Sequence, residues 1–121
     1  MGQDVGEVLR LLLIDAGEFG VRARVGGGVV SIVLPLRNTE FNASNTGWWV
    51  VHRLGGGREV VVEYRPGLGP VITFTGPGGA EEYDFENASV SLDYHDLLIR
   101  VSIILGDNTI VGRYALPPGV D

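Results

Sequence analysis

The 121-residue sequence predicts an all-β domain with one short N-terminal helix. We expect an antiparallel meander of eight or nine strands that forms an up-and-down barrel, with a two-sheet β-sandwich as the alternative. Two observations predict this class: runs of roughly eight residues alternate between apolar and polar, and short turns rich in glycine or proline separate them. Because short turns favour pairing between sequence neighbours, we expect one β domain over residues 1–121, with strands over 19–117.

Residues 4–15 are the helix candidate. Asp4 fits an N-cap with Glu7 as its reciprocal partner, and Gly17 fits a C-terminal stop. Five apolar residues follow helical spacing: Val5, Val8, Leu9, Leu12 and Leu13. Leu11 and Ile14 make the segment apolar on more than one side, so it is either a helix covered on two sides or a buried strand.

Two strands and a polar segment follow. Residues 19–25 alternate, and residues 29–36 are apolar on both faces, with Pro35 placing that strand near a sheet edge. Residues 37–46 are the longest polar, turn-forming stretch, so we expect a connection there and would look for function in it first. Phe41 lies within it and would cover a cavity mouth or return to the core.

Residues 47–65 predict a hairpin that turns at Gly55-Gly56-Gly57. Because side chains alternate along a strand, Trp48 and Trp49 face opposite sides, and Trp48 shares its side with His52. In the return strand, Tyr64 lies on one face and its neighbours Glu63 and Arg65 lie on the other. Which tryptophan faces the core, and what covers the other, stays open.

The second half of the sequence predicts four more strands. They cover residues 71–75, 81–92 with a bend at Asn87, 97–105 and 109–116. Residues 94–96 predict a turn, and Gly106-Asp107-Asn108 predicts a tight hairpin between the last two strands.

Composition excludes several classes of chemistry. The chain has no cysteine, which excludes disulfides, thiolate nucleophiles and cysteine-ligated metals. All nine basic residues are arginine, which excludes Schiff-base chemistry and the lysine of phosphate-binding P-loops. The exclusive use of arginine, the missing cysteine and the single methionine are compatible with a thermophile.

Charge and hydropathy predict where the protein works. A net charge of −6 without a basic run would repel a phosphate backbone, so we expect no nucleic-acid partner. The apolar run over residues 8–14 is too short to cross a membrane and lacks a signal-peptide cleavage pattern. We therefore expect no membrane partner and a cytoplasmic location.

No catalytic constellation, cofactor motif or metal-ligand spacing is found. His52 is best interpreted as a core or ligand-facing imidazole, and His95, between Asp93 and Asp96, as part of a solvated turn. An enzyme that uses His95 with either aspartate is a minor hypothesis. Four carboxylates on one strand predict a solvated face: Glu81, Glu82, Asp84 and Glu86.

The aromatic residues predict the function that we prefer. In a barrel, Trp48, His52, Tyr64 and Tyr114 would line the lumen with Phe41 at its mouth, which suits a small apolar ligand with one polar end. The expected function is a non-catalytic binding module. The alternative is a structural or assembly protein acting as a homo-oligomer, as in a virion, a filament or a chaperone-like particle, because residues 8–14 and 29–36 are apolar on more than one side.

Two resemblances are limited in extent. Residues 112–121, GRYALPPGVD, are similar to the Arg-aromatic-x-Leu-Pro-x-Gly-Val-Asp segment of small heat-shock proteins. A strand followed by a Pro-Pro-Gly turn explains the same residues. A helix before eight meandering strands is similar in outline to calycin-type barrels, although their Gly-x-Trp signature has no counterpart near the first strand. Neither resemblance identifies a family.

Overall fold

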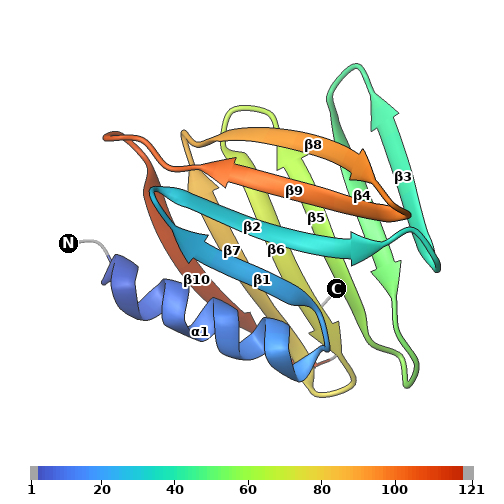
Figure 1. The fold of residues 1–121 in the computed structure, drawn as a ribbon. Helices are drawn as coiled ribbons and strands as arrows, with labels where there is room; N and C mark the ends of the chain where they lie inside the picture. The colour runs from blue at the N-terminus through green and yellow to red at the C-terminus, as the bar shows by residue number, and fades with distance from the viewer. Residues whose placement is uncertain (1–2, 119–121) are drawn as a thin grey trace.

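The computed structural model describes residues 3–118, which form one helix and ten strands in two antiparallel sheets (Figure 1). In chain order the elements are α1 (Val5–Glu18), β1 (Arg22–Gly26), β2 (Val29–Pro35), β3 (Thr39–Ser44), β4 (Gly47–Arg53), β5 (Glu59–Arg65), β6 (Gly69–Gly76), β7 (Gly79–Glu86), β8 (Ser89–His95), β9 (Leu98–Ile104) and β10 (Ile110–Leu116).

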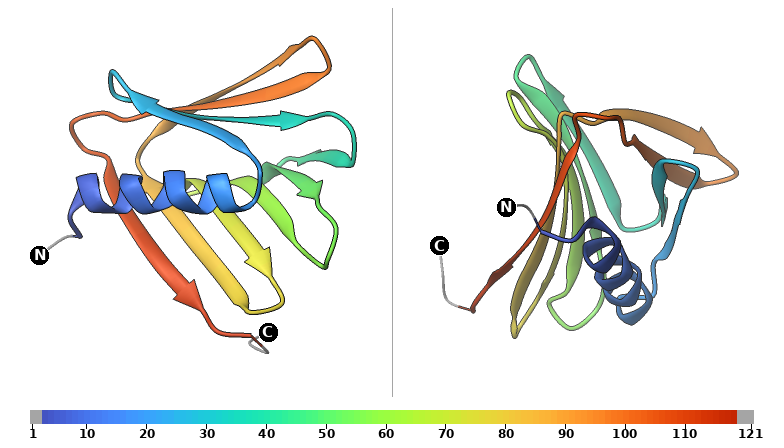
Figure 2. Two further views of the ribbon diagram at one scale, coloured as in Figure 1. Left: turned by 60° about the horizontal axis from the view of Figure 1, so that its bottom comes forward. Right: turned by 90° about the vertical axis from the view of Figure 1, so that its left-hand side faces the viewer.

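The two sheets face each other as a sandwich. The smaller sheet has the order β1-β2-β9-β8 and the larger has the order β10-β7-β6-β5-β4-β3. Between these sheets no strand pairing is present in residues 3–118, so the predicted barrel is wrong and the alternative sandwich is confirmed. Figure 2 shows the sheets diverging on one side, where α1 lies between them. The helix contacts both β1 and β10, the two edge strands that closure of a barrel would have to pair on this side.

The core consists of alternate residues from the inward faces of both sheets. Its fully buried side chains include the aromatic residues Phe74, Tyr83 and Phe85 of the larger sheet and aliphatic residues of both sheets: Val30, Ile32, Leu34, Val50, Val60, Ile72, Ile99 and Ile103. The opposite residues of the same strands face outward. Each sheet therefore has one apolar face against the core and one solvent-exposed face, as expected for antiparallel sheets.

Helix α1 was predicted correctly, although it ends later than Gly17. The side chain of Asp4 accepts a hydrogen bond from the Gly6 amide at 3.1 Å, which confirms the N-cap. Glu7 is not the reciprocal partner, because its carboxylate pairs with Arg10 one turn on. The chain leaves the helix at Gly20, where φ is +68°, a conformation that glycine adopts without strain.

The polar segment 37–46 is mostly a strand, which corrects the expected long connection. Thr39 and Phe41 pair with His52 and Val50 of β4, and β3 forms the outer edge of the larger sheet. Period-two alternation is present here, but nearly all of β3 is solvent-exposed, so its composition resembles that of a loop. An edge strand needs little apolar burial because one neighbour strand supplies its hydrogen bonds.

Two further connections differ from the prediction because they move the chain between sheets. The expected strand 81–92 is two strands, β7 in the larger sheet and β8 in the smaller, joined at Asn87 with φ of +67°. The expected hairpin at residues 106–108 joins β9 to β10, which also belong to different sheets. Local turn signals are the same for a hairpin and for a sheet-switching connection, so sequence patterns did not distinguish them.

Truncating Leu12 should reveal how strongly α1 stabilises the sandwich. Leu12 is 0% exposed against the core, whereas its neighbour Leu13 is 39% exposed. We expect Leu12→Ala to lower the free energy of unfolding by about 2–5 kcal/mol, because a buried leucine leaves a cavity. Leu13→Ala, which makes the same chemical change on the same helix, should cost under about 1 kcal/mol. Urea unfolding of both variants provides the measurement, and equal losses would contradict this packing of α1.

Candidate functional site

Three of the predicted ligand-binding residues lie together on the inward face of the larger sheet. The rings of Phe41 and Trp48 are stacked, with centroids 6.4 Å apart and an interplanar angle of 26°. Tyr64 is directly opposite Trp48 in the register of β4 and β5. We call Phe41, Trp48 and Tyr64 the aromatic ledge.

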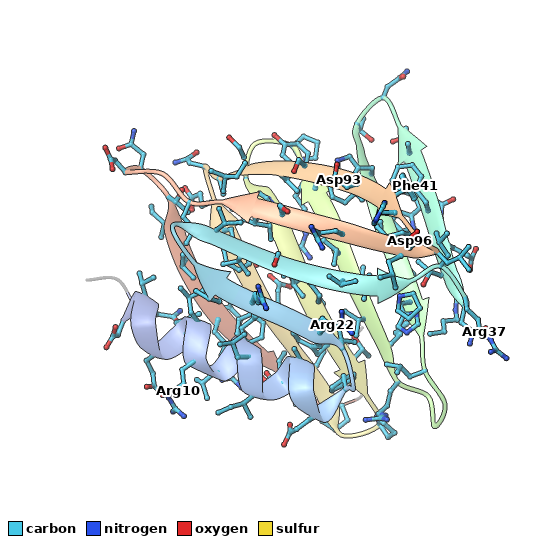
Figure 3. The ribbon with its side chains drawn as sticks, in the orientation of Figure 1. Arg10, Arg22, Arg37, Phe41, Asp93 and Asp96 are labelled. Atoms are coloured by element: carbon cyan, nitrogen blue, oxygen red, sulfur yellow. The ribbon has the colours of Figure 1, made fainter. Side chains whose placement is uncertain are left out.

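The ledge lies near the edge of the sandwich. The hairpin that joins β3 to β4 projects beyond β8, the edge strand of the smaller sheet (Figures 1 and 2). Trp48 is partly buried against the core, whereas the Phe41 side chain, labelled in Figure 3, is 45% exposed. Solvent therefore reaches the outermost ring of the ledge without any movement of the sheets.

His52 is not part of this ledge. It lies four residues along β4 from Trp48, about 13 Å away at the usual rise of a strand. The imidazole is only 7% exposed, and its Nδ1 lies 2.8 Å from the Thr39 hydroxyl oxygen. Burial lowers the pKa of His52. It is therefore a neutral, hydrogen-bonded core residue.

Tyr114 projects from the opposite face of the larger sheet, so the prediction that it shares a face with Trp48 is wrong. It pairs with Glu82 of β7, which faces outward because the next residue, Tyr83, faces the core. The Tyr114 ring folds over Gly112, where an added Cβ would come within 2.8 Å of the phenol oxygen. The alternation of β10 alone did not reveal which of its faces is covered by the core.

The two tryptophans face opposite sides of the larger sheet. Trp48 packs against the core, and Trp49 faces outward with 42% of its surface exposed. Both border a hollow of about 180 Å³ at the ends of β4 and β5, together with Ser44, Thr46 and Arg65 among its lining residues. An exposed tryptophan beside hydroxyl and guanidinium groups offers an apolar surface with polar contacts at its rim.

Outward-facing carboxylates gather around Arg65 on the larger sheet. The Arg65 guanidinium donates to Glu63 and, at 3.2 and 3.3 Å, to both carboxylate oxygens of Glu82. Asp84 is the next outward residue along β7. Burial, together with the adjacent Glu82 carboxylate, raises the pKa of Asp84 to about 7. The sequence predicted one solvated face for Glu81, Glu82, Asp84 and Glu86. Glu81 instead lies on the face of Tyr83, where it pairs with Arg113 at 2.8 Å, and the perturbed carboxyl group of Asp84 was not predicted.

A hollow that the sequence analysis did not single out lies on the outer face of the smaller sheet. It has a volume of about 380 Å³, and its lining includes Arg22, Arg24, Arg100, Ser31 and Ser102. The signal was present in the sequence as two arginines alternating along β1. Only the pairing of β1, β2 and β9 shows that these arginines share a face with Arg100.

His95 lies at the tip of the β8–β9 hairpin. Its Nε2 is 3.0 Å from a carboxylate oxygen of Asp96, and both side chains are at least 80% exposed. Asp96 and Leu97 have positive φ values and make the turn itself. Both side chains are exposed to water, as in the predicted solvated turn, and His95 also borders a hollow of about 420 Å³ together with Asp93 and Arg100.

Comparison with protein-family models, curated proteins and solved structures found no match to this chain. Within residues 3–118, no three histidine, aspartate or glutamate side chains are grouped so that they could hold a metal ion. Over the same residues, α1 lacks the length and hydrophobicity that a membrane-spanning helix requires.

The raised pKa of Asp84 predicts a pH-dependent stability. The folded protein binds this proton more tightly than the unfolded chain, whose aspartate has a pKa near 3.8, so the contribution of Asp84 is present below pH 3.8 and is lost as pH rises through about 7. Asp84→Asn, which imitates the protonated acid, should therefore raise the melting temperature at pH 8 and have little effect near pH 4.

Glu86→Gln is the matched control, because it removes one carboxylate from the same face of the same strand. The measurement is the melting temperature of the wild-type, Asp84→Asn and Glu86→Gln proteins at a series of pH values. Wild-type and Asp84→Asn proteins with the same dependence of melting temperature on pH would contradict the assignment to Asp84.

Proposed function

We propose that the protein is a non-catalytic binding module that takes a small apolar ligand with one polar end at the aromatic ledge. The observation that carries the proposal is the exposed Phe41 ring stacked on Trp48. Aromatic side chains supply large apolar contact areas with defined geometry, and a flat ligand that stacks on Phe41 would extend the existing pair. Tyr64, opposite Trp48, offers a phenol hydroxyl to the polar end.

The packing of the core supports an approach of the ligand from the open side of the ledge. Val50, Val60 and Val62, the inward residues next to the ledge, are completely buried by neighbouring side chains. A ligand between the sheets would have to displace them at the cost of their packing. The ligand therefore approaches from the projecting β3–β4 hairpin, where Phe41 is exposed.

1-Naphthol, a flat apolar molecule with one hydroxyl, is a suitable probe. The protein has two tryptophans, so its ¹⁵N–¹H spectrum contains two indole signals that a Trp49→Phe variant assigns. We expect the probe to shift the Trp48 indole signal. Phe41→Ala should weaken binding by about 2- to 10-fold, the usual value of one aromatic contact, without changing the melting temperature by more than a few degrees.

Tyr114→Ala is the control, because it removes an equally exposed aromatic ring from the opposite face of the same sheet. Its affinity for 1-naphthol should match that of the wild type. Shifts confined to Trp49, or a loss of affinity in Tyr114→Ala as large as in Phe41→Ala, would reject the ledge as the binding site.

Self-assembly is the second candidate function. Three apolar side chains of α1 are exposed, namely Val5, Leu13 and Ile14, although the helix already buries Val8, Leu12 and Ala16 against the sandwich. Exposed apolar side chains gathered on one element are common where copies of a chain associate.

Light scattering at increasing protein concentration tests this candidate. If α1 joins copies, the mass should exceed the 13.0 kDa of one chain and return to it in a Leu13→Glu, Ile14→Glu variant. The charged side chains would be costly to bury in an apolar interface. A wild-type mass that stays monomeric into the millimolar range would eliminate the candidate.

A further inference from the structure

The outer face of the smaller sheet has a regular arrangement that follows from strand register. One row across the sheet reads Arg22, Val33, Arg100 and Asp93, and the next row reads Arg24, Ser31, Ser102 and Ser91. Long guanidinium side chains therefore stand beside a row of short hydroxyl side chains. Figure 3 labels Arg22 on β1 and Asp93 on β8, at opposite edges of this face.

Short residues flanked by long ones make this face hollow. The cavity of about 380 Å³ has Ser31 and Ser102 on its floor and the three arginines around it. A second cavity, of about 420 Å³, continues from it toward β8 and shares Val33, Leu98 and Arg100 as walls. We call the first of these cavities the arginine groove. Its volume is within the range of small-molecule binding sites.

Within residues 3–118, the arginines of the groove form no ion pair with an acidic side chain. In residues 3–118 the arginines that make ion pairs are Arg10, Arg53, Arg65 and Arg113, and none of these lines the groove. Asp93 is the one carboxylate among the outward-facing strand residues of this sheet, and it forms no ion pair with Arg100. Among the residues that the structure describes, the three positive charges of the groove are thus unpaired, in a protein whose net charge is −6.

The geometry points to the arginine groove as a binding site for a small polyanion, a molecule with at least two oxyanion groups. Guanidinium groups bind phosphate, sulfate or carboxylate oxygens through paired, charge-assisted hydrogen bonds, and serine hydroxyls donate to the same oxygens. Arg22 and Arg24 lie on β1, whereas Arg100 lies two strands away on β9, about 10 Å across the sheet. Two separated anionic groups match this spacing better than one.

The charge of the rest of the molecule limits the size of the ligand. The charged side chains on the outer face of the larger sheet are mostly acidic: Glu40, Glu59, Glu63, Glu82, Asp84 and Glu86, against Arg53 and Arg65. A long polyanion such as a nucleic acid would extend beyond the groove and meet repulsion from the acidic remainder of the molecule. A small molecule is held within the groove, and Val29, Val33 and Leu98 provide apolar contact for its carbon part.

Inorganic pyrophosphate is the first probe, since it carries two linked oxyanion groups, and inorganic phosphate and citrate provide comparisons with one phosphate and with three carboxylates. In ¹⁵N–¹H spectra at low salt, we expect pyrophosphate to shift the amide signals of β1, β2 and β9 selectively. The affinity should fall steeply with added salt, as for any arginine–oxyanion contact. Tighter binding of pyrophosphate than of phosphate would support a ligand with two anionic groups.

Substitutions separate a built site from general attraction. Arg24→Gln and Arg100→Gln should each weaken pyrophosphate binding by about 10-fold or more. Ser31→Ala, which removes only the hydroxyl, should weaken it by a smaller factor. Arg37→Gln is the matched control, because Arg37 is exposed in the connection between β2 and β3, away from the groove lining, and its loss changes the net charge equally.

Several results would overturn the proposal. These are the absence of selective shifts, equal losses in Arg37→Gln and Arg24→Gln, or tighter binding of a single-stranded oligonucleotide than of pyrophosphate. Self-association that Arg100→Gln abolishes would instead make this face an interface between copies. Circular dichroism and melting temperature confirm that each variant is folded, and because the substituted side chains project outward from the sheet, we expect each to fold.

Discussion

Helix α1 lies between β1 and β10 and keeps the two sheets open on that side of the sandwich. Val8, Leu12 and Ala16, one turn apart on the helix, are buried against the core, and they hold the two edge strands too far apart to pair. The Tyr83 hydroxyl of β7 donates to Asp15 and accepts from Arg113 Nε at 3.0 Å, which joins the helix to the larger sheet. Burial and the Asp15 carboxylate raise the pKa of Tyr83, so this phenol stays protonated.

An open sandwich leaves surfaces that a closed barrel of this size would not. A closed barrel has one filled interior and one continuous exterior, whereas two sheets of unequal size leave part of the larger one uncovered. The aromatic ledge lies near that uncovered margin, beside the β3–β4 hairpin that projects past β8. The site proposed for an apolar ligand is thus a consequence of the unequal sheets rather than of an internal lumen.

The outward faces of the two sheets differ in charge: acidic side chains predominate among the charged residues of the larger sheet, and arginines among those of the smaller. On the larger sheet, Arg65 is neutralised by Glu63 and Glu82, and burial together with the adjacent Glu82 carboxylate raises the pKa of Asp84 to about 7. On the smaller sheet, Arg22, Arg24 and Arg100 line a groove with Ser31 and Ser102 and form no ion pair within the described part of the chain. The overall acidity of the chain conceals this separation, because net charge reports the sum and not the arrangement.

Local patterns of residues were sufficient to predict the secondary structure wherever those patterns were strong. The Asp4 cap, the helical spacing of α1 and the alternation of β2, β4, β5 and β9 are local properties of neighbouring residues, and local geometry fixes which side chains share a face. The same alternation established that Trp48 and Trp49 face opposite sides. The composition of the chain also excluded cysteine and lysine chemistry without reference to any fold.

The pairing of strands and the burial of sheet faces could be assigned only from the folded chain. Turns at Asn87 and at residues 106–108 fit a hairpin or a change of sheet equally well, so the choice between barrel and sandwich depended on contacts between distant residues. Tyr114 was assigned to the wrong face, and β3 was not recognised as a strand, for the same reason. The arginine groove joins residues from β1 and β9, more than 70 positions apart, because register rather than sequence proximity sets the neighbours of a side chain within a sheet.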